Sequence, residues 1–211
     1  MNIFLTAIGT DSGKSVVSAI LTEALQADYW KPIQAGFPTD TETVHQLLPT
    51  KKEKLEEAYL LKYPMSPHAS ANKEGVYVDL ETIKIPSHKN ENMIIEGAGG
   101  IMVPLNNKDM VIDIAEKFKL PVILVSNIYL GNINHTLLSI NELKRRGLKL
   151  AGIVFNGDRN IDTENVILEH AEAPCLFHLP QLDQVTPDSI KRVAEEVRPQ
   201  LYQLLNIENY A

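Results

Sequence analysis

Residues 6–15 read TAIGTDSGKS and lie between an apolar run at 3–8 and an apolar segment of helical spacing at 15–26. The final Gly-Lys-Ser is how a phosphate-binding loop ends, but the commonest form of that loop has a glycine five positions before the glycine of this triplet. This chain has Ile8 there. Because a strand before the loop and a helix after it are the required context, we interpret the stretch as a phosphate site of a less common form. The alternative is a plain strand-turn-helix.

The residues of this loop have separate expected roles. Backbone amides at the start of the following helix point at anionic oxygens, Lys14 adds a positive charge, and the Ser15 hydroxyl can bind magnesium. Asp11 repels phosphate by Coulomb's law. We therefore expect the Asp11 side chain to point outward or to reach a ribose.

Short apolar runs alternate with amphipathic segments along the chain. The runs that read as strands buried on both faces cover residues 2–8, 91–97, 120–127, 149–157 and 173–180. The segments with helical spacing cover residues 15–26, 110–119, 134–147 and 187–205. This alternation predicts an α/β fold with a mostly parallel central sheet and helices on both faces, of the phosphate-loop NTPase type. At 211 residues, we expect a single domain, 1–211.

Two segments carry finer signals. In the last but one helical segment, Leu137, Ile140 and Leu143 share a face, and Gly147 suits the end of the helix. The polar, proline-interrupted region from 49 to 92 contains the run KKEKLEE at 51–57, which we interpret as the solvated face of a helix.

The composition argues against several classes of partner. The net charge is −7 and the isoelectric point is about 5.4, whereas nucleic acids and anionic membranes are held by clustered lysine and arginine. No apolar run approaches the roughly 18–20 residues needed to cross a bilayer. We therefore expect a cytoplasmic protein with no nucleic-acid or membrane partner. The single cysteine, Cys175, excludes an internal disulfide and is interpreted as a buried strand thiol rather than a nucleophile.

A second motif, MIIEGAGG at 93–100, places a carboxylate at the end of an apolar strand. Glu96 is followed by glycines and an alanine, which allow the backbone to approach a ligand closely. In phosphate-loop proteins an acid at the end of a neighbouring strand binds magnesium directly or through water. Glu96 fits that position, and the alternative is a glycine-rich turn with an incidental glutamate.

A third motif, YWKPIQAG at 29–36, places Lys31 just before a proline. A lysine at the carboxyl end of a parallel strand faces the ligand crevice, where it would add a second positive charge beside Lys14. Taken alone, Lys31 is more often an ordinary surface lysine, and Asp40 an ordinary loop or helix-cap acid.

Several motifs follow the loop in a fixed order. They are KPIQAG at 31–36, SPHASA at 66–71, EGAGG at 96–100 with VPL at 103–105, and LGNINH at 130–135. With them, the chain from Ile3 to about Leu182 resembles the dethiobiotin synthetase family. The loop of that family carries an additional residue and tolerates a small residue at the position of Ala7, which accounts for the irregular start of the motif.

The resemblance implies a reaction and its participants. Members of the family bind 7,8-diaminononanoate, CO2 and MgATP, with ATP as a substrate and Mg2+ as the cofactor. They form a carbamate on one amine and phosphorylate it to a carbamic-phosphoric anhydride. The second amine then closes the ureido ring of dethiobiotin, in biotin biosynthesis, with loss of phosphate.

The resemblance also assigns roles to matching positions. Lys31 corresponds to the active-site lysine near the carbamate, and Lys14 to the lysine that contacts the phosphates. Ser15, Asp40 and Glu96 correspond to the magnesium ligands, with Asp40 matched only through its short surrounding stretch TDTETV.

Further positions correspond to the nucleotide and substrate sites. Asn156 matches the asparagine that recognises adenine, and residues 131–134 match a segment that closes the substrate site of the other subunit, which implies a homodimer. The implied nucleotide-binding residues are Thr10, Asp11, Ser12, Gly13, Lys14, Ser15, Val16, Glu96, Gly97, Ala98, Gly99, Asn156, Pro180, Gln181 and Leu182. The implied substrate-binding residues are Lys31, Ala35, Gly99, Gly131, Asn132, Ile133 and Asn134.

The chain departs from the family pattern at some positions. Ala35 stands where the family usually has a serine or threonine that can hydrogen-bond the substrate, and losing one such bond costs roughly 0.5–1.5 kcal/mol. Asp11 is shorter than the acid found there in some members, which leaves its ribose role open. His68 could act as a base, but a histidine beside a proline in a turn more often only orders the loop.

Other phosphate-loop ATPases are the alternatives. A small-molecule kinase should have a mobile lid with arginines, yet the first arginine is Arg145. A cobyrinate-type amidation enzyme usually has a glutaminase domain with a nucleophilic cysteine, for which this chain has no room. A partition or switch ATPase usually carries a second lysine near the start of its loop, where this chain has Gly9 and Thr10.

Overall fold

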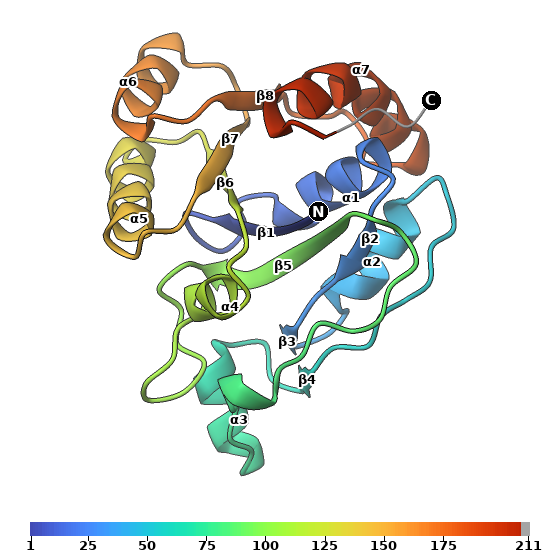
Figure 1. Cartoon of the computed structure of the whole chain (residues 1–211), viewed down its shortest axis with the longest axis vertical. Coiled ribbons are helices and arrows are strands. Elements are labelled where there is room, and N and C mark those ends of the chain that lie inside the picture. Colours follow the sequence, from blue (N-terminus) through green and yellow to red (C-terminus); the bar gives the residue numbers. More distant parts are fainter. Residues whose placement is uncertain (208–211) are drawn as a thin grey trace.

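A six-stranded parallel sheet forms the centre of the computed structural model, which describes residues 1–207 (Figure 1). Every strand pair in this sheet is parallel. In spatial order the strands are β2 (Asp28–Trp30), β5 (Met93–Gly100), β1 (Asn2–Ala7), β6 (Val122–Asn127), β7 (Leu150–Asn156) and β8 (Cys175–Leu179). The sheet confirms the predicted fold class. Four of the five predicted strand runs contain one of these strands, and the run at 91–97 overlaps β5, which continues to Gly100.

Helices cover both faces of the sheet (Figure 1). Alternate residues of β1 point to opposite faces of the sheet. Ile3 and Leu5 pack into the apolar cluster on one face, and Phe4 packs into the cluster on the other. The first face carries α1 (Lys14–Ala24), α2 (Asp40–Leu47) and α7 (Pro187–Leu205). The second face carries α4 (Val111–Lys117), α5 (Asn132–Arg145) and α6 (Ile161–Ala171). Burial on both sides explains why the strands are apolar almost without interruption.

Helix α5 follows the predicted pattern. Ile140 and Leu143 are buried, and the partly buried Leu137 packs on the same apolar cluster as Ile140. Gly147 has a φ of 67° and donates its amide to the carbonyl of Lys144, which ends the helix as expected.

The region between β2 and β5 holds smaller elements. They are the two-stranded parallel sheet of β3 (Ile33–Ala35) and β4 (Tyr59–Leu61), helix α3 (Pro67–Glu74) and the 3-10 turn η1 (Leu80–Thr82). The predicted helix face at 51–57 is wrong, because these residues have irregular backbone. Only Leu55 of that run is buried, so the segment has no apolar stripe that could hold a helix against the core.

The parallel arrangement brings several loops to one edge of the sheet. β1 lies between β5 and β6, and its carboxyl end leads directly into the loop before α1. Glu96 of β5 pairs in register with Leu5 of β1. In open parallel sheets, the edge at the carboxyl ends of the strands is where ligands bind. Among residues 1–207, no helix is long and apolar enough to span a membrane.

Candidate active site

A cavity of about 760 Å³ opens at this edge of the sheet. Its walls come from the loop before α1, the segment from Lys31 to Ala35, the start of α2, the end of β5 and the residues before α3. Residues that are far apart in the sequence therefore face one hollow, as the three motifs predicted.

The loop before α1 is shaped by Gly13. This residue has a φ of 86°, and a Cβ atom there would lie 2.3 Å from Nδ2 of Asn156. Asn156 in turn donates to the carbonyl of Ser12 at 3.0 Å. No side chain caps the start of α1, so its first amides are directed at the cavity without a competing acceptor. The loop thus has the conformation that an anion site needs.

Lys14 lies inside the loop and reaches back to its start. Its Nζ donates to the carbonyl of Gly9 at 3.1 Å. Burial, followed by the charge of Lys31, lowers the pKa of Lys14. Asp11 has a left-handed backbone, is exposed and lines the same cavity. Its carboxylate makes no ion pair with Lys14, and its expected role, pointing outward or reaching a ribose, stays a prediction.

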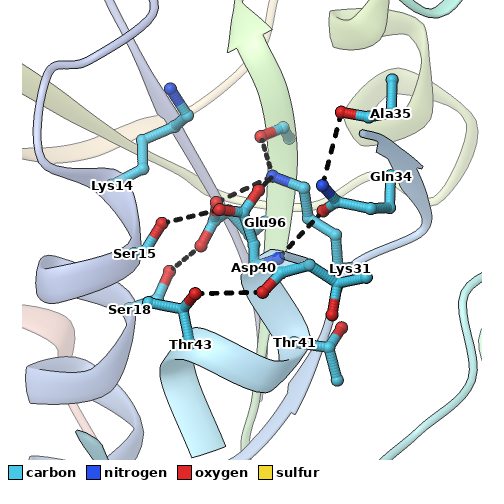
Figure 2. Close-up of polar contacts among 12 residues, drawn as sticks. Lys14, Ser15, Ser18, Lys31, Gln34, Ala35, Asp40, Thr41, Thr43 and Glu96 are labelled. Carbon is cyan, nitrogen blue, oxygen red and sulfur yellow. Dashed lines mark hydrogen bonds and ion pairs between the residues drawn. The ribbon is translucent and has the colours of Figure 1, made fainter. Parts of the chain in front are cut away.

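Lys31 is the centre of a buried ion cluster (Figure 2). Its Nζ lies 2.7 Å from Oδ2 of Asp40, 2.8 Å from Oε1 of Glu96 and 3.1 Å from the carbonyl oxygen of Gly97. Lys31 is only 2% exposed. Burial alone lowers its pKa, but the charges of Glu96 and Asp40 outweigh burial, so the pKa is raised. Lys31 is therefore a buried, charged ammonium at neutral pH and not a surface lysine.

The other oxygen of Glu96 is held from two further elements. Oε2 accepts hydrogen bonds from Oγ of Ser18 at 2.5 Å and from the hydroxyl of Tyr29 at 3.1 Å. Burial, followed by the charge of Glu96, raises the pKa of Tyr29 well above its usual value. Neither Ser18 nor Tyr29 was predicted from the sequence. The signal for Ser18 was its position three residues after Ser15, on the same face of α1.

Asp40 is positioned by the start of α2. The Thr39 side chain accepts from the amide of Glu42, and Glu42 accepts from the amide of Thr39, which forms a capping box. The amide of Asp40 donates to Oε1 of Gln34 at 3.1 Å, a second contact that the sequence did not reveal. Burial raises the pKa of Asp40, but the charge of Lys31 outweighs it and the pKa is lowered. Asp40 is therefore ionised.

The residues at the mouth of the ion cluster suit a magnesium ion. Oγ of Ser15 lies 2.9 Å from Oδ1 of Asp40, and both are the hard oxygen donors that Mg2+ prefers. Glu96 lines the same cavity, although its oxygens are already bonded to Ser18, Tyr29 and Lys31. Residues 1–207 contain no group of three or more acidic, histidine or cysteine side chains arranged for a metal. The remaining ligands would come from nucleotide phosphates and water, as is usual for Mg2+.

A second cavity of about 280 Å³ shares Gly13 and Val16 with the first. It is lined by Asn156 at the end of β7 and by Pro180, Gln181 and Leu182 after β8. These residues were assigned to the base of the nucleotide through the resemblance, and the structure places them beside the phosphate loop. Most of the implied nucleotide-binding positions therefore surround two adjoining cavities.

Some predicted residues lie elsewhere. Residues 131–134 do not line either cavity, and the buried Asn132 bonds through its side chain to Oγ of Ser126 at 3.4 Å. His68 lines a separate cavity behind α3, so no contact places it as a base in the ion cluster. Cys175 begins β8 and is half-buried, and burial raises its pKa to about 11, the opposite of an activated thiol.

A family model described as "AAA domain" matches residues 1–189. The ATP-dependent dethiobiotin synthetase BioD of Cytophaga hutchinsonii is 50% identical over 202 residues, which cover 95% of this chain and 98% of that relative. The protein of the same name from Christiangramia forsetii is 44% identical over 204 residues, again 95% of this chain and 98% of the relative. The chain belongs to the dethiobiotin synthetase family.

Solved structures of other proteins share the fold of this dethiobiotin synthetase family member. The septum site-determining protein MinD of Pyrococcus horikoshii, complexed with Mg-ADP, has a TM-score of 0.57 and 17% identity, covering 97% of this chain and 93% of that one. A ParA family ATPase from Chlorobium tepidum has a TM-score of 0.53 and 12% identity, covering 98% and 93%. The likeness to both proteins confirms the predicted phosphate-loop NTPase fold and concerns the fold alone.

Proposed function

We propose that this chain catalyses the ATP-dependent carboxylation and ring closure of 7,8-diaminononanoate to dethiobiotin, a ligase reaction of biotin biosynthesis. The observation that carries the proposal is the convergence of Lys14, Lys31 and the Ser15–Asp40 oxygen pair on one cavity. The relatives with 50% and 44% identity, both named ATP-dependent dethiobiotin synthetase, support it. Because ATP is a substrate, we place the reaction in the cytoplasm.

ATP would span the two adjoining cavities. Its phosphates would take the amides at the start of α1 and the charge of Lys14, and its base would lie beside Asn156 and the segment 180–182. Ser15 and Asp40, with Glu96 nearby, would hold Mg2+, which supplies neutralisation of phosphate charge when bound. The wider cavity beside Lys31 then remains for the diamine.

The chemistry needs alignment and positive charge more than a protein nucleophile. A carbamate oxygen attacks the γ-phosphorus of ATP, the bond to the β-phosphate oxygen breaks, and ADP leaves. Two anions must meet in this step, so the two ammonium groups of Lys14 and Lys31 lower its barrier. The second amine then attacks the carbamate carbon, loses its proton and expels phosphate.

A homodimer would complete the substrate site. Residues 131–134 lie outside the chain's own cavity, as expected if they serve a partner's. An apolar groove of about 370 Å³ separates the loop before α1 from α5 and is lined by Ile101, Met102 and Leu138, among others. Met102 is 51% exposed and Leu138 is 59% exposed, and exposed apolar side chains around a groove favour an interface. We assign this groove to the second copy of the chain.

The function is tested by incubating the purified protein with 7,8-diaminononanoate, bicarbonate and MgATP. We expect phosphate release that depends on the diamine, with one dethiobiotin formed per phosphate. An equal rate of phosphate release with and without the diamine would contradict the proposal. If a DNA or lipid surface accelerated such release, a partition or switch ATPase would take its place.

A further inference from the structure

We propose that the Lys31 ammonium and the divalent cation compete for the same carboxylates, so that entry of the ion releases Lys31 toward the substrate. This inference rests on the proposed function for the identity of the substrate, but not for the competition itself. It assigns to Lys31 a role in the unliganded site that precedes its contact with the carbamate.

The oxygens around Lys31 resemble the surroundings of a metal ion. Three oxygen atoms, from Asp40, Glu96 and the carbonyl of Gly97, lie within 2.7–3.1 Å of its Nζ. They come from α2 and β5, whereas Lys31 itself follows β2 (Figure 2). An all-oxygen set with two carboxylates is the ligand type of a hard divalent cation. The ammonium therefore occupies a place that suits such an ion.

Glu96 has no spare oxygen for a metal in this arrangement. Ser18 and Tyr29 hold Oε2, and Lys31 holds Oε1. Glu96 is 1% exposed, so solvent does not reach its carboxylate. An ion that bridges Glu96 and Asp40 would take the place of the ammonium between them, so Lys31 would have to leave at least one of the two carboxylates.

The charges explain why the exchange is useful. The ammonium groups of Lys14 and Lys31 cancel the carboxylates of Asp40 and Glu96, so these four groups carry no net charge before the ion enters. A divalent cation adds two positive charges among them and takes at least one carboxylate from Lys31. A free ammonium beside a buried cation attracts an anion strongly, because the low dielectric strengthens the interaction. The cavity would thus become ready for a carbamate only when the metal is in place.

The direct test is the affinity of the nucleotide-free protein for Mn2+, followed through the electron paramagnetic resonance signal of the free ion. Removing the competitor in Lys31→Met should tighten Mn2+ binding by about tenfold, since each carboxylate no longer has to give up a charged hydrogen bond. Lys14→Met is the matched control. It removes the same charge from the same cavity, but Lys14 bonds a backbone carbonyl and neither carboxylate. Lys14→Met should change the Mn2+ affinity by less than about threefold, because it acts only through long-range electrostatics.

A second measurement uses the unaltered chain, because Lys31→Met leaves the buried Glu96 carboxylate without its charged partner and could unfold the protein. Acetylation of Lys31 is followed by peptide mass spectrometry with MgCl2 or with KCl at equal ionic strength. We expect Mg2+ to increase the rate at Lys31 several-fold and to leave the rate at Lys14 nearly unchanged.

Three results would overturn the inference. They are equal Mn2+ affinities of the two variants, no Mn2+ binding by a folded Lys31→Met protein, and no rise in Lys31 acetylation with Mg2+. Equal Mn2+ affinities would mean that the metal ion and the Lys31 ammonium bind Asp40 at the same time, with the metal ion on the side of Ser15. None of these assays contains the diamine. Their failure with intact diamine-dependent turnover would remove the competition alone, and loss of turnover with these results intact would remove the proposed function alone.

Discussion

Lys31 touches two carboxylates and one backbone carbonyl, whereas the phosphate loop is served by Lys14. Lys31→Ala should therefore raise the dissociation constant of MgATP by less than about threefold, while lowering turnover by about a hundredfold or more, as for loss of a charge that stabilises a transition state. Isothermal titration with MgATP and single-turnover phosphate release measure the two quantities. A large loss of ATP affinity would place Lys31 on the nucleotide instead.

Ala35 lines the cavity where the resemblance expects a hydroxyl. Ala35→Thr and Ala35→Val add side chains of the same shape, and only the threonine can bond the substrate. We expect the KM for the diamine to be about two- to tenfold lower in the threonine variant than in the valine variant, the worth of one hydrogen bond. Steady-state kinetics at saturating ATP measure the KM of each variant for the diamine. Equal KM values would show that position 35 does not face a polar group of the diamine.

Helix α2 positions Asp40 as its first residue, and the capping box of Thr39 and Glu42 fixes the residue at which the helix begins. Thr39→Ala should lower the free energy of unfolding by about 1 kcal/mol and also lower turnover, because Asp40 is the first residue of the helix. Thr186→Ala is the matched control, since Thr186 caps α7 in the same way and does not touch the ion cluster. It should cost about the same stability and keep turnover at saturating ATP. Urea unfolding and phosphate release separate the two effects, and equal losses of turnover would reduce Thr39 to a structural role.

The elements that could be predicted are those with long, regular patterns. The long apolar runs gave the five strands of the central sheet besides β2, and helical spacing gave α1, α4, α5 and α7. The three-residue strands β2, β3 and β4 are too short for a period to show. Helix α2 was visible in principle, because Thr39 and Glu42 have the spacing of a capping box.

At the site, too, only residues within a recognisable sequence motif could be predicted. Lys14, Ser15 and Glu96 stand in glycine-rich motifs that favour a phosphate or metal site, so they could be predicted. Lys31, taken alone, was more often a surface lysine, and only the resemblance to the family assigned it to the site. The residues that hold these side chains in place could not, except that the position of Ser18 three residues after Ser15 puts it on the same face of α1. Ser18, Tyr29 and Gln34 are single polar residues within apolar segments, and only their tertiary contacts with Glu96 and Asp40 show what they do.

At the scale of the whole molecule, the proposed dimer predicts the effect of a charge in the apolar groove. Leu138→Glu should shift the protein from dimer to monomer in sedimentation velocity, because an unpaired carboxylate is costly in a buried interface. Diamine-dependent turnover should fall with it, while MgATP affinity should persist. Leu60→Glu is the control, since Leu60 is also exposed but lies on β4, away from the groove. A Leu138→Glu protein that remains dimeric and active would exclude this groove as the interface.

The proposed reaction requires this cavity to hold a carbamate against the γ-phosphate of ATP. The most direct measurement follows oxygen from 18O-labelled bicarbonate, with MgATP and the diamine in a reaction short enough to limit exchange with water. Because the carbamate oxygen that attacks phosphorus leaves with the phosphate at ring closure, the released phosphate should carry one 18O atom, seen by its isotope shift in 31P NMR. Phosphate released without label, while bicarbonate remains labelled, would mean that water and not a carbamate attacks ATP, and would contradict the account.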